Sequence, residues 1–184
     1  RREAVVRKAL FCARVFLEGY PQDGGCDEGP GYFNAAGACL LDLLEIVEGA
    51  RCDGGESAFH VDKLPAMASY IAKVHIHGEY FINFADAPAR VTPPAIALCR
   101  AADRLNIPQL RAFALPFWPE APELPRAFPY RQMLDLLAEK PCEAAAAAKP
   151  APGAYFPGIQ VCVGRGEHLF FAAKAGHNAE SHNH

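Results

Sequence analysis

The last eight residues of the chain, HNAESHNH at 177–184, gather side chains that can bind metals and transfer protons. Three of the seven histidines lie there. On a β-strand, the H-x-H pair of His182 and His184 would point both imidazoles to one face, and two neutral imidazoles are a common half of a zinc site. His177 follows a glycine and could approach from a loop. The same composition is also typical of a polar loop or of a purification tag.

A glycine-rich segment far upstream, DGGCDEGPGYFN at 23–34, carries three acidic residues and a tyrosine next to a predicted helix. It is longer than a connection between two helices needs. Tyr32 would lie just before the N-terminus of that helix, whose dipole and nearby cations stabilise a phenolate. Such a tyrosine could act as an acid or a base near neutral pH. The alternative is an ordinary interhelical loop in which Glu28 and Tyr32 have no chemical role.

Two other parts of the chain hold polar side chains that could serve a site. Asn83 and Asp86, in FINFADAP, would cap the turn into the following helix, and no chemistry is assigned to them. Arg165 and Lys174 flank a predicted hairpin near the C-terminus. Most such residues are solvated surface charges, but the carboxylate of a uronic acid would need a cation of this kind.

The elements that would position these residues are mainly helical. Apolar side chains at helical spacing predict helices over residues 3–20, 35–48, 64–74, 93–105, 108–117 and 128–139. For the second helix, Asn34 is the predicted N-cap and Gly49 the predicted C-terminal glycine. Residues 75–90 predict a short strand or an extended loop. The alanine- and proline-rich residues 141–153 predict a linker, and the apolar runs at 159–163 and 168–174 predict a β-hairpin.

Composition excludes several classes of function. The 184 residues are 51% hydrophobic, enough to bury a core, and 18 basic residues against 21 acidic ones leave a net charge of −3. We therefore expect no nucleic-acid partner. No apolar run reaches the length of a membrane span, and no signal peptide is visible. The seven cysteines are scattered without a C-x-x-C pair, which argues against a zinc ribbon or a disulfide scaffold.

Four segments together resemble, in order and spacing, the heparinase II/III-like family of polysaccharide lyases. They are DGGCDEGPGYFN, YFINFADA, YFPGIQVCVGRG and FAAKAGHNAESHNH, of which the last is the most specific. The resemblance covers most of the chain. It implies a mainly α fold with a β C-terminal part, namely an incomplete (α/α) toroid followed by the first strands of an antiparallel β-sandwich. Residues 1–140 would be the C-terminal part of the toroid, 141–153 the linker and 154–184 the truncated start of the sandwich.

The resemblance also implies a reaction, β-elimination beside a uronic acid in a polysaccharide. A base removes the C5 proton, an acid protonates the leaving oxygen, and a neutralising group stabilises the carboxylate. Tyr32 matches the catalytic tyrosine of the family, and His182 matches the histidine that comes from the β-domain. His184 matches a position that ligates zinc in some members. The substrate-binding residues would be Glu28, Lys174, His177 and Asn178.

The resemblance makes an acidic polysaccharide the expected partner and zinc the one metal considered. Family members usually act outside the bacterial cytoplasm, so a periplasmic or secreted location is expected. Both ends look cut from a longer protein, and further metal ligands and a carboxylate-binding Asn or His would come from outside this segment. Two other classes stay open: a non-catalytic helical domain that binds glycans or another protein, and a metal-dependent hydrolase built on the H-x-H pair. The polymer and the oligomeric state are not indicated.

Overall fold

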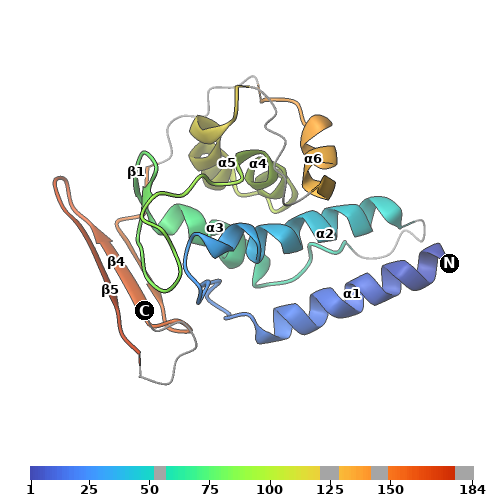
Figure 1. Cartoon of the computed structure of the whole chain (residues 1–184), viewed down its shortest axis with the longest axis horizontal. Helices are drawn as coiled ribbons and strands as arrows, with labels where there is room; N and C mark the ends of the chain where they lie inside the picture. Colours follow the sequence, from blue (N-terminus) through green and yellow to red (C-terminus); the bar gives the residue numbers. More distant parts are fainter. Residues whose placement is uncertain (52–56, 121–128, 142–148, 177–184) are drawn as a thin grey trace.

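The computed structural model describes residues 1–51, 57–120, 129–141 and 149–176. This part of the chain contains six α-helices, two short 3-10 helices and two small antiparallel sheets (Figure 1). The α-helices are α1 (Arg2–Gly19), α2 (Gly37–Ala50), α3 (Leu64–Lys73), α4 (Ala95–Arg104), α5 (Pro108–Ala114) and α6 (Pro129–Leu136). The 3-10 helices are Tyr32–Asn34 and Leu115–Phe117. The strands are β1 (His75–His77), β2 (Tyr80–Phe81), β3 (Gly153–Phe156), β4 (Val161–Arg165) and β5 (Phe170–Lys174). The prediction of a mainly helical chain with a β C-terminal part is confirmed.

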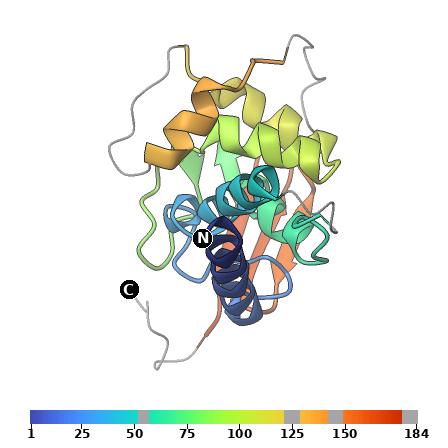
Figure 2. The ribbon, with the colours of Figure 1, turned by 90° about the vertical axis from the view of Figure 1, so that its right-hand side faces the viewer.

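The helices form layers with the larger sheet at one end. α1 and α2 run antiparallel, connected by the long loop that holds residues 23–34, and α4, α5 and α6 lie on the other side of α2 (Figure 1). Seen from the side, α1 lies below α2 and the α4–α6 group lies above it (Figure 2). The sheet of β3, β4 and β5 stands at the end where α3 and the long loop lie.

Most helix boundaries follow from local sequence signals. Pro65 and Pro108 lie in the first turns of α3 and α5, where the missing N–H of proline costs no hydrogen bond. The buried faces of the helices match the predicted apolar spacing, as with Ala13 and Leu17 in α1. The predicted helix at 108–117 is confirmed as α5 continued by the 3-10 turn Leu115–Phe117.

Both predicted ends of α2 are wrong. Asn34 is the last residue of a 3-10 helix, and the N-cap of α2 is Ala36, which makes no side-chain capping bond. The side chain of Asn34 instead accepts a hydrogen bond from Arg131 of α6, because a buried guanidinium needs acceptors more than an accessible helix end does. Gly49 lies inside α2, which continues to Ala50 with Arg51 as its C-cap.

The β elements are more extensive than predicted. β1 and β2 form a short hairpin within residues 75–90, where a short strand or an extended loop was predicted. β4 and β5 form the predicted C-terminal hairpin, with Val161 opposite Lys174 and Arg165 opposite Phe170. β3 pairs antiparallel with β4 and was not predicted; its first residue, Gly153, falls within the predicted linker. A four-residue strand bounded by prolines carries too little alternation to be recognised from sequence.

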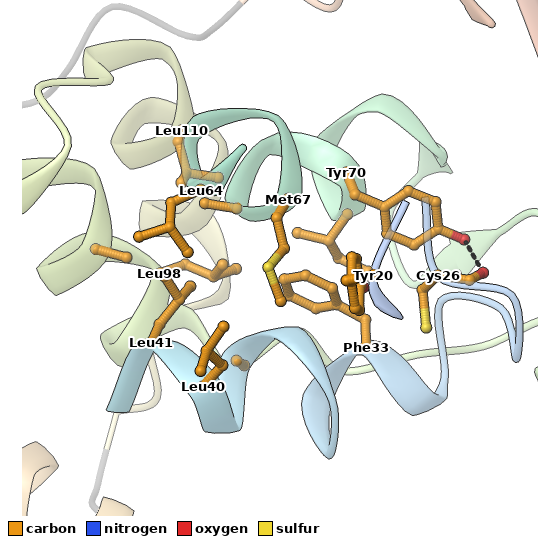
Figure 3. Close-up of a cluster of buried hydrophobic side chains, with 14 of the residues drawn as sticks. Tyr20, Cys26, Phe33, Leu40, Leu41, Leu64, Met67, Tyr70, Leu98 and Leu110 are labelled. Atoms are coloured by element: carbon orange, nitrogen blue, oxygen red, sulfur yellow. Dashed lines mark hydrogen bonds between the residues drawn. The ribbon is translucent and has the colours of Figure 1, made fainter. Parts of the chain in front are cut away.

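The sheet and the helices share one hydrophobic core. Phe156 and Val161 from the sheet belong to the same buried cluster as Met67 and Tyr70 of α3. The rings of Tyr70 and Phe156 meet edge to face, with centroids 5.2 Å apart. Figure 3 shows the neighbouring part of this core, where Tyr70 donates a hydrogen bond to the carbonyl oxygen of Cys26 at 3.4 Å. The core therefore holds the 23–34 loop against both α3 and the sheet.

Candidate functional site

The 23–34 loop is bound to the sheet through Asp23. One carboxylate oxygen of Asp23 accepts a hydrogen bond from the backbone N–H of Gly25 at 2.8 Å, and the other accepts one from Gly158 at 2.6 Å. Gly158 lies in the turn between β3 and β4. A Cβ atom added to Gly25 would lie 2.8 Å from the side chain of Ile159 in the same turn. The first half of the loop therefore lies against the segment YFPGIQ.

The second half of the loop lies against residues 84–88. Gly29 has φ +87°, and an added Cβ would lie 2.7 Å from both the Cβ of Ala87 and the carbonyl oxygen of Phe84. An added Cβ at Gly31 would lie 2.8 Å from Cδ of Pro88. Glycine is required at these points because the backbones approach too closely for a side chain. Residues 29–31 and FADAP are therefore neighbours in space, although more than fifty positions separate them in the sequence.

Tyr32 follows these glycines and is directed to the surface. Its side chain is 44% exposed, whereas the next residue, Phe33, is fully buried with its ring centroid 6.0 Å from that of Tyr70. The carbonyl oxygen of Tyr32 accepts hydrogen bonds from the N–H groups of Ala35 and Ala36, both at 2.9 Å. The buried Phe33 and these two bonds fix the backbone of Tyr32. α2 begins at Gly37 rather than directly after Tyr32, so the helix N-terminus expected to act on this phenol starts later in the chain than predicted.

Of the other predicted site residues, the structure describes Lys174 and Glu28. Lys174 ends β5, and its Nζ atom lies 5.9 Å from the ring centroid of Phe84, which places it at the 84–88 segment that contacts the loop. The backbone N–H of Glu28 donates to the side chain of Asp27 at 3.0 Å, within the same loop. Glu28, Tyr32 and Lys174 thus lie on adjoining segments. Four predicted site residues lie outside the described residues: His177, Asn178, His182 and His184.

Arg165 is not available to a ligand as a solvated surface charge. Its Nη2 atom donates to the carbonyl oxygen of Lys73 at 2.8 Å and its Nε atom to that of Ala151 at 3.1 Å. Its guanidinium also stacks over the ring of Phe170. Burial lowers the pKa of Arg165 from its ordinary value. Arg165 therefore connects the sheet to the end of α3.

A buried ionic network on the far side of α2 was not predicted. Asp42 is 1% exposed and accepts hydrogen bonds from Nε of Arg131 at 2.5 Å and from Nη2 of Arg100 at 2.7 Å. Arg100 also donates to Glu45 at 2.8 Å and to Asp135. Burial raises the pKa of Asp42, against the opposing effect of the two guanidinium groups. The sequence carries one sign of this network: Asp42 is an acidic residue inside the apolar stripe of a helix, and a buried carboxylate requires a cation as partner.

This network connects the loop to the helical layers. The same Arg131 side chain donates to the side-chain oxygen and, at 3.2 Å, to the carbonyl oxygen of Asn34, two residues after Tyr32. α2, α4, α6 and the 3-10 turn that begins at Tyr32 are thereby joined by one set of charged hydrogen bonds. The backbone that presents Tyr32 is supported from both sides, by the core under Phe33 and by Arg131.

A separate apolar cavity of about 560 Å³ opens between α1 and α2. Its walls include Cys12, Phe16, Cys39, Leu43 and Tyr130. The Sγ atom of Cys39 lies 3.0 Å from Oη of Tyr130, and burial is the main cause that raises the pKa of Tyr130 to about 12. Among the described residues that line the cavity, the ionisable ones are the thiols of Cys12 and Cys39 and the phenol of Tyr130, so it suits apolar groups rather than a charged sugar.

The described residues contain no group of three or more His, Cys, Asp or Glu side chains arranged to hold a metal ion. The predicted zinc ligand, His184, is outside that part of the chain. His75 is surrounded by the rings of Phe81, Phe113 and Phe117, with centroids 4.8 to 5.6 Å away, and burial lowers its pKa. Among the helices within the described ranges, none combines the length and apolar character that crossing a bilayer requires.

The sequence segments singled out above meet around the 23–34 loop. Residues 23–34, 84–88, 158–159 and Lys174 come together at the end of the helical layers where the sheet stands. Comparison of the sequence with models of known protein families and with curated proteins gave no match.

Proposed function

We propose that this chain is part of a polysaccharide lyase of the heparinase II/III-like kind, which cleaves a uronic-acid-containing polymer by β-elimination. The observation that carries the proposal is that all four segments of the resemblance are distant in sequence but contribute residues to one region, around the 23–34 loop. The helices would belong to an incomplete (α/α) toroid, and β3, β4 and β5 would be the first strands of a β-sandwich.

In the proposed reaction, the phenolic oxygen of Tyr32 takes the C5 proton of the uronate. The electrons of the C5–H bond form the C4–C5 double bond, the C4–O bond breaks, and the leaving oxygen takes a proton back from the phenol of Tyr32, which thus acts as both base and acid. Tyr32 suits this role because it is exposed while its backbone is fixed by Phe33 and by the hydrogen bonds of its carbonyl group. Lys174 would neutralise the substrate carboxylate as charge spreads into it.

Residues outside the described part of the chain complete the proposal. His182 would assist the proton transfer, and His177 and Asn178 would bind the sugar together with Glu28, which the structure describes in the 23–34 loop. Zinc would be held through His184, and no step of the elimination is assigned to it. By resemblance, the protein would act in the periplasm or after secretion.

The test is formation of an unsaturated uronide, followed by its ultraviolet absorbance on a panel of uronic-acid polymers. It should be run with this chain and with a longer polypeptide that contains it, with zinc supplied. We expect Tyr32→Phe to abolish turnover while leaving the thermal unfolding midpoint unchanged. Near-normal activity of Tyr32→Phe would refute its assignment. Cleavage without the chromophore, lost on chelation, would indicate the metal-dependent hydrolase instead.

A second candidate is a non-catalytic helical domain that binds protein, and one observation favours it. α1 carries apolar side chains beyond its buried face: Ala13 and Leu17 are buried, while Phe11, Val15 and Phe16 are at least 40% exposed, and Phe16 also lines the cavity. Exposed apolar side chains gathered on one helix are often covered by another element or a partner. Absence of elimination on every polymer, together with a chain that binds the same polymers no better than a neutral glycan, would favour this candidate.

A further inference from the structure

An exposed aromatic and basic cluster lies on the β1–β2 hairpin. Arg90 stacks over the ring of Tyr80, with its Cζ atom 5.2 Å from the ring centroid, and its Nη2 atom donates to Oη of Tyr80 at 2.9 Å. The ring of His77 lies on the other strand of the hairpin, 5.3 Å from that of Tyr80 between centroids. All three side chains are exposed. The cluster combines a flat apolar ring with hydrogen-bond donors and positive charge.

The backbone fixes the relative positions of these side chains. Tyr80 and Arg90 form an antiparallel bridge, flanked by hydrogen bonds from Phe81 N to Ala89 O at 2.9 Å and from Val91 N to Glu79 O at 3.0 Å. This pattern makes Tyr80 and Arg90 a pair without mutual backbone hydrogen bonds, in which side chains on one face come closest. The geometry of the cluster is therefore present without a ligand.

The opposite face of the hairpin is anchored in the core. Phe81 is buried, and its ring lies 4.8 Å from that of His75, which also contacts Phe113 and Phe117. The Nε2 atom of His75 is 2.8 Å from the carbonyl oxygen of Gly78 in the hairpin turn. A rigid support of this kind lowers the entropic cost of binding, because the binding side chains need little ordering.

The cluster adjoins the proposed catalytic loop along the chain. Arg90 comes two positions after Pro88, the residue against which Gly31 packs, and Gly31 precedes Tyr32. Figures 1 and 2 show the light-green chain after β2 running beside the blue loop that leads into α2 before it continues to α4. A polymer bound at Tyr32 would therefore have this hairpin among its nearest surfaces.

We propose that Tyr80, Arg90 and His77 form a sugar-binding subsite that holds an acidic residue of the polymer next to the one that is cleaved. The inference rests on the proposed function for its substrate class. The ring of Tyr80 packs against the C–H face of the sugar, and Arg90 and His77 donate hydrogen bonds to its carboxylate or sulfate. Among the described residues, Tyr80 Oη is the one side-chain acceptor of Arg90, which leaves the other guanidinium N–H groups for a ligand.

The test is a calorimetric titration of the full chain with a hexamer of uronic acid residues and with the same hexamer after reduction of its carboxyl groups. We expect Arg90→Ala to weaken binding of the acidic hexamer about tenfold, the usual effect of losing a hydrogen bond to a charged group. Arg90→Lys should recover part of the loss, since it keeps the charge without the planar donor pair. Arg90→Ala should leave binding of the reduced hexamer unchanged.

Tyr80→Ala should weaken binding of both hexamers about threefold to tenfold, because ring stacking does not depend on the carboxyl groups. Tyr155→Ala is the matched control, since Tyr155 is a 66% exposed tyrosine on β3, which belongs to the other sheet. Thermal melts of each variant separate lost binding from lost folding. Tyr80→Leu, which removes the aromatic ring but fills more of its space, provides a second variant if Tyr80→Ala fails to fold.

The outcomes distinguish this inference from the proposed function. Binding of the acidic hexamer that Arg90→Ala and Tyr80→Ala weaken and Tyr32→Phe leaves intact, with no elimination product from any variant, would support the subsite and refute the lyase. Elimination with unchanged hexamer affinity in Arg90→Ala and in Tyr80→Ala or Tyr80→Leu would support the lyase and refute the subsite. A chain that binds neither hexamer would refute the subsite as well.

Discussion

Replacing Asp42 by alanine should destabilise the protein more than any exposed charge substitution. Asp42 accepts from Arg131 at 2.5 Å and from Arg100 at 2.7 Å. Arg100 keeps Glu45 and Asp135 as partners, whereas Arg131, whose side chain is 4% exposed, loses its ion pair with Asp42. Breaking a buried ion pair on one side costs about 3–5 kcal/mol, because a buried charge loses its partner of opposite sign. At about 2–4 °C per kcal/mol for a chain of this length, the melting temperature should fall by roughly 6–20 °C.

The assay is chemical denaturation of four proteins: wild type, Asp42→Ala, Arg131→Met and the double variant. The double variant should be more stable than Asp42→Ala alone, because it also removes the guanidinium that had paired with Asp42. Its remaining cost of about 1–2 kcal/mol comes from the oxygen atoms of Asn34 that lose a donor. Arg14→Ala is the control, since its pair with Glu18 at 3.1 Å is largely exposed and should contribute within about 0.5 kcal/mol. Strictly additive single and double variants would refute the reasoning.

Three other perturbations test the loop and the hairpin. Gly29→Ala should lower the unfolding free energy by roughly 1–3 kcal/mol, because Gly29 has a positive φ and lies close to Ala87. Gly49→Ala is the control: it lies inside α2 with open space around it and should raise the unfolding free energy by about 0.5–1 kcal/mol. Asp23→Ala should speed amide hydrogen exchange at the β3–β4 turn and cost about 1 kcal/mol; unchanged exchange would contradict its role. Burial lowers the pKa of His75, so the unfolded state binds more protons than the folded state and stability should decrease as pH falls below about 6.5. Denaturation of wild type and His75→Gln at several pH values tests this, and the variant should show a flatter pH dependence.

The helices were largely predictable because their signals are local. Apolar spacing and the prolines at 65 and 108 located α3 and α5 within a few residues of their observed bounds. The failures at Asn34 and Gly49 have one cause: capping residues were assigned as if α2 were isolated. In the folded chain, the demand of a buried Arg131 for acceptors decides what the side chain of Asn34 binds.

The candidate site was predictable as a set of residue types, but its arrangement was not. Tyr32, Glu28 and Lys174 were singled out from glycine-rich and hairpin segments, and the structure places all three on adjoining segments. Arg165, weighed as a ligand for a carboxylate, is used to join the sheet to α3. The pairing of Tyr80 with Arg90 depends on a backbone register between residues ten positions apart, which no periodicity signals.

The amino-acid sequence alone determined the helical content, the C-terminal hairpin and the chemical nature of the loop, because these depend on side chains that are neighbours along the chain. Tertiary structure alone decided that β3 joins the sheet, that Arg131 binds Asp42 and Asn34 together, and that the glycines at 29 and 31 pack on residues 84–88. The physical reason is that close packing and the pairing of buried charges are satisfied between elements far apart in sequence, and only the folded chain brings those elements together.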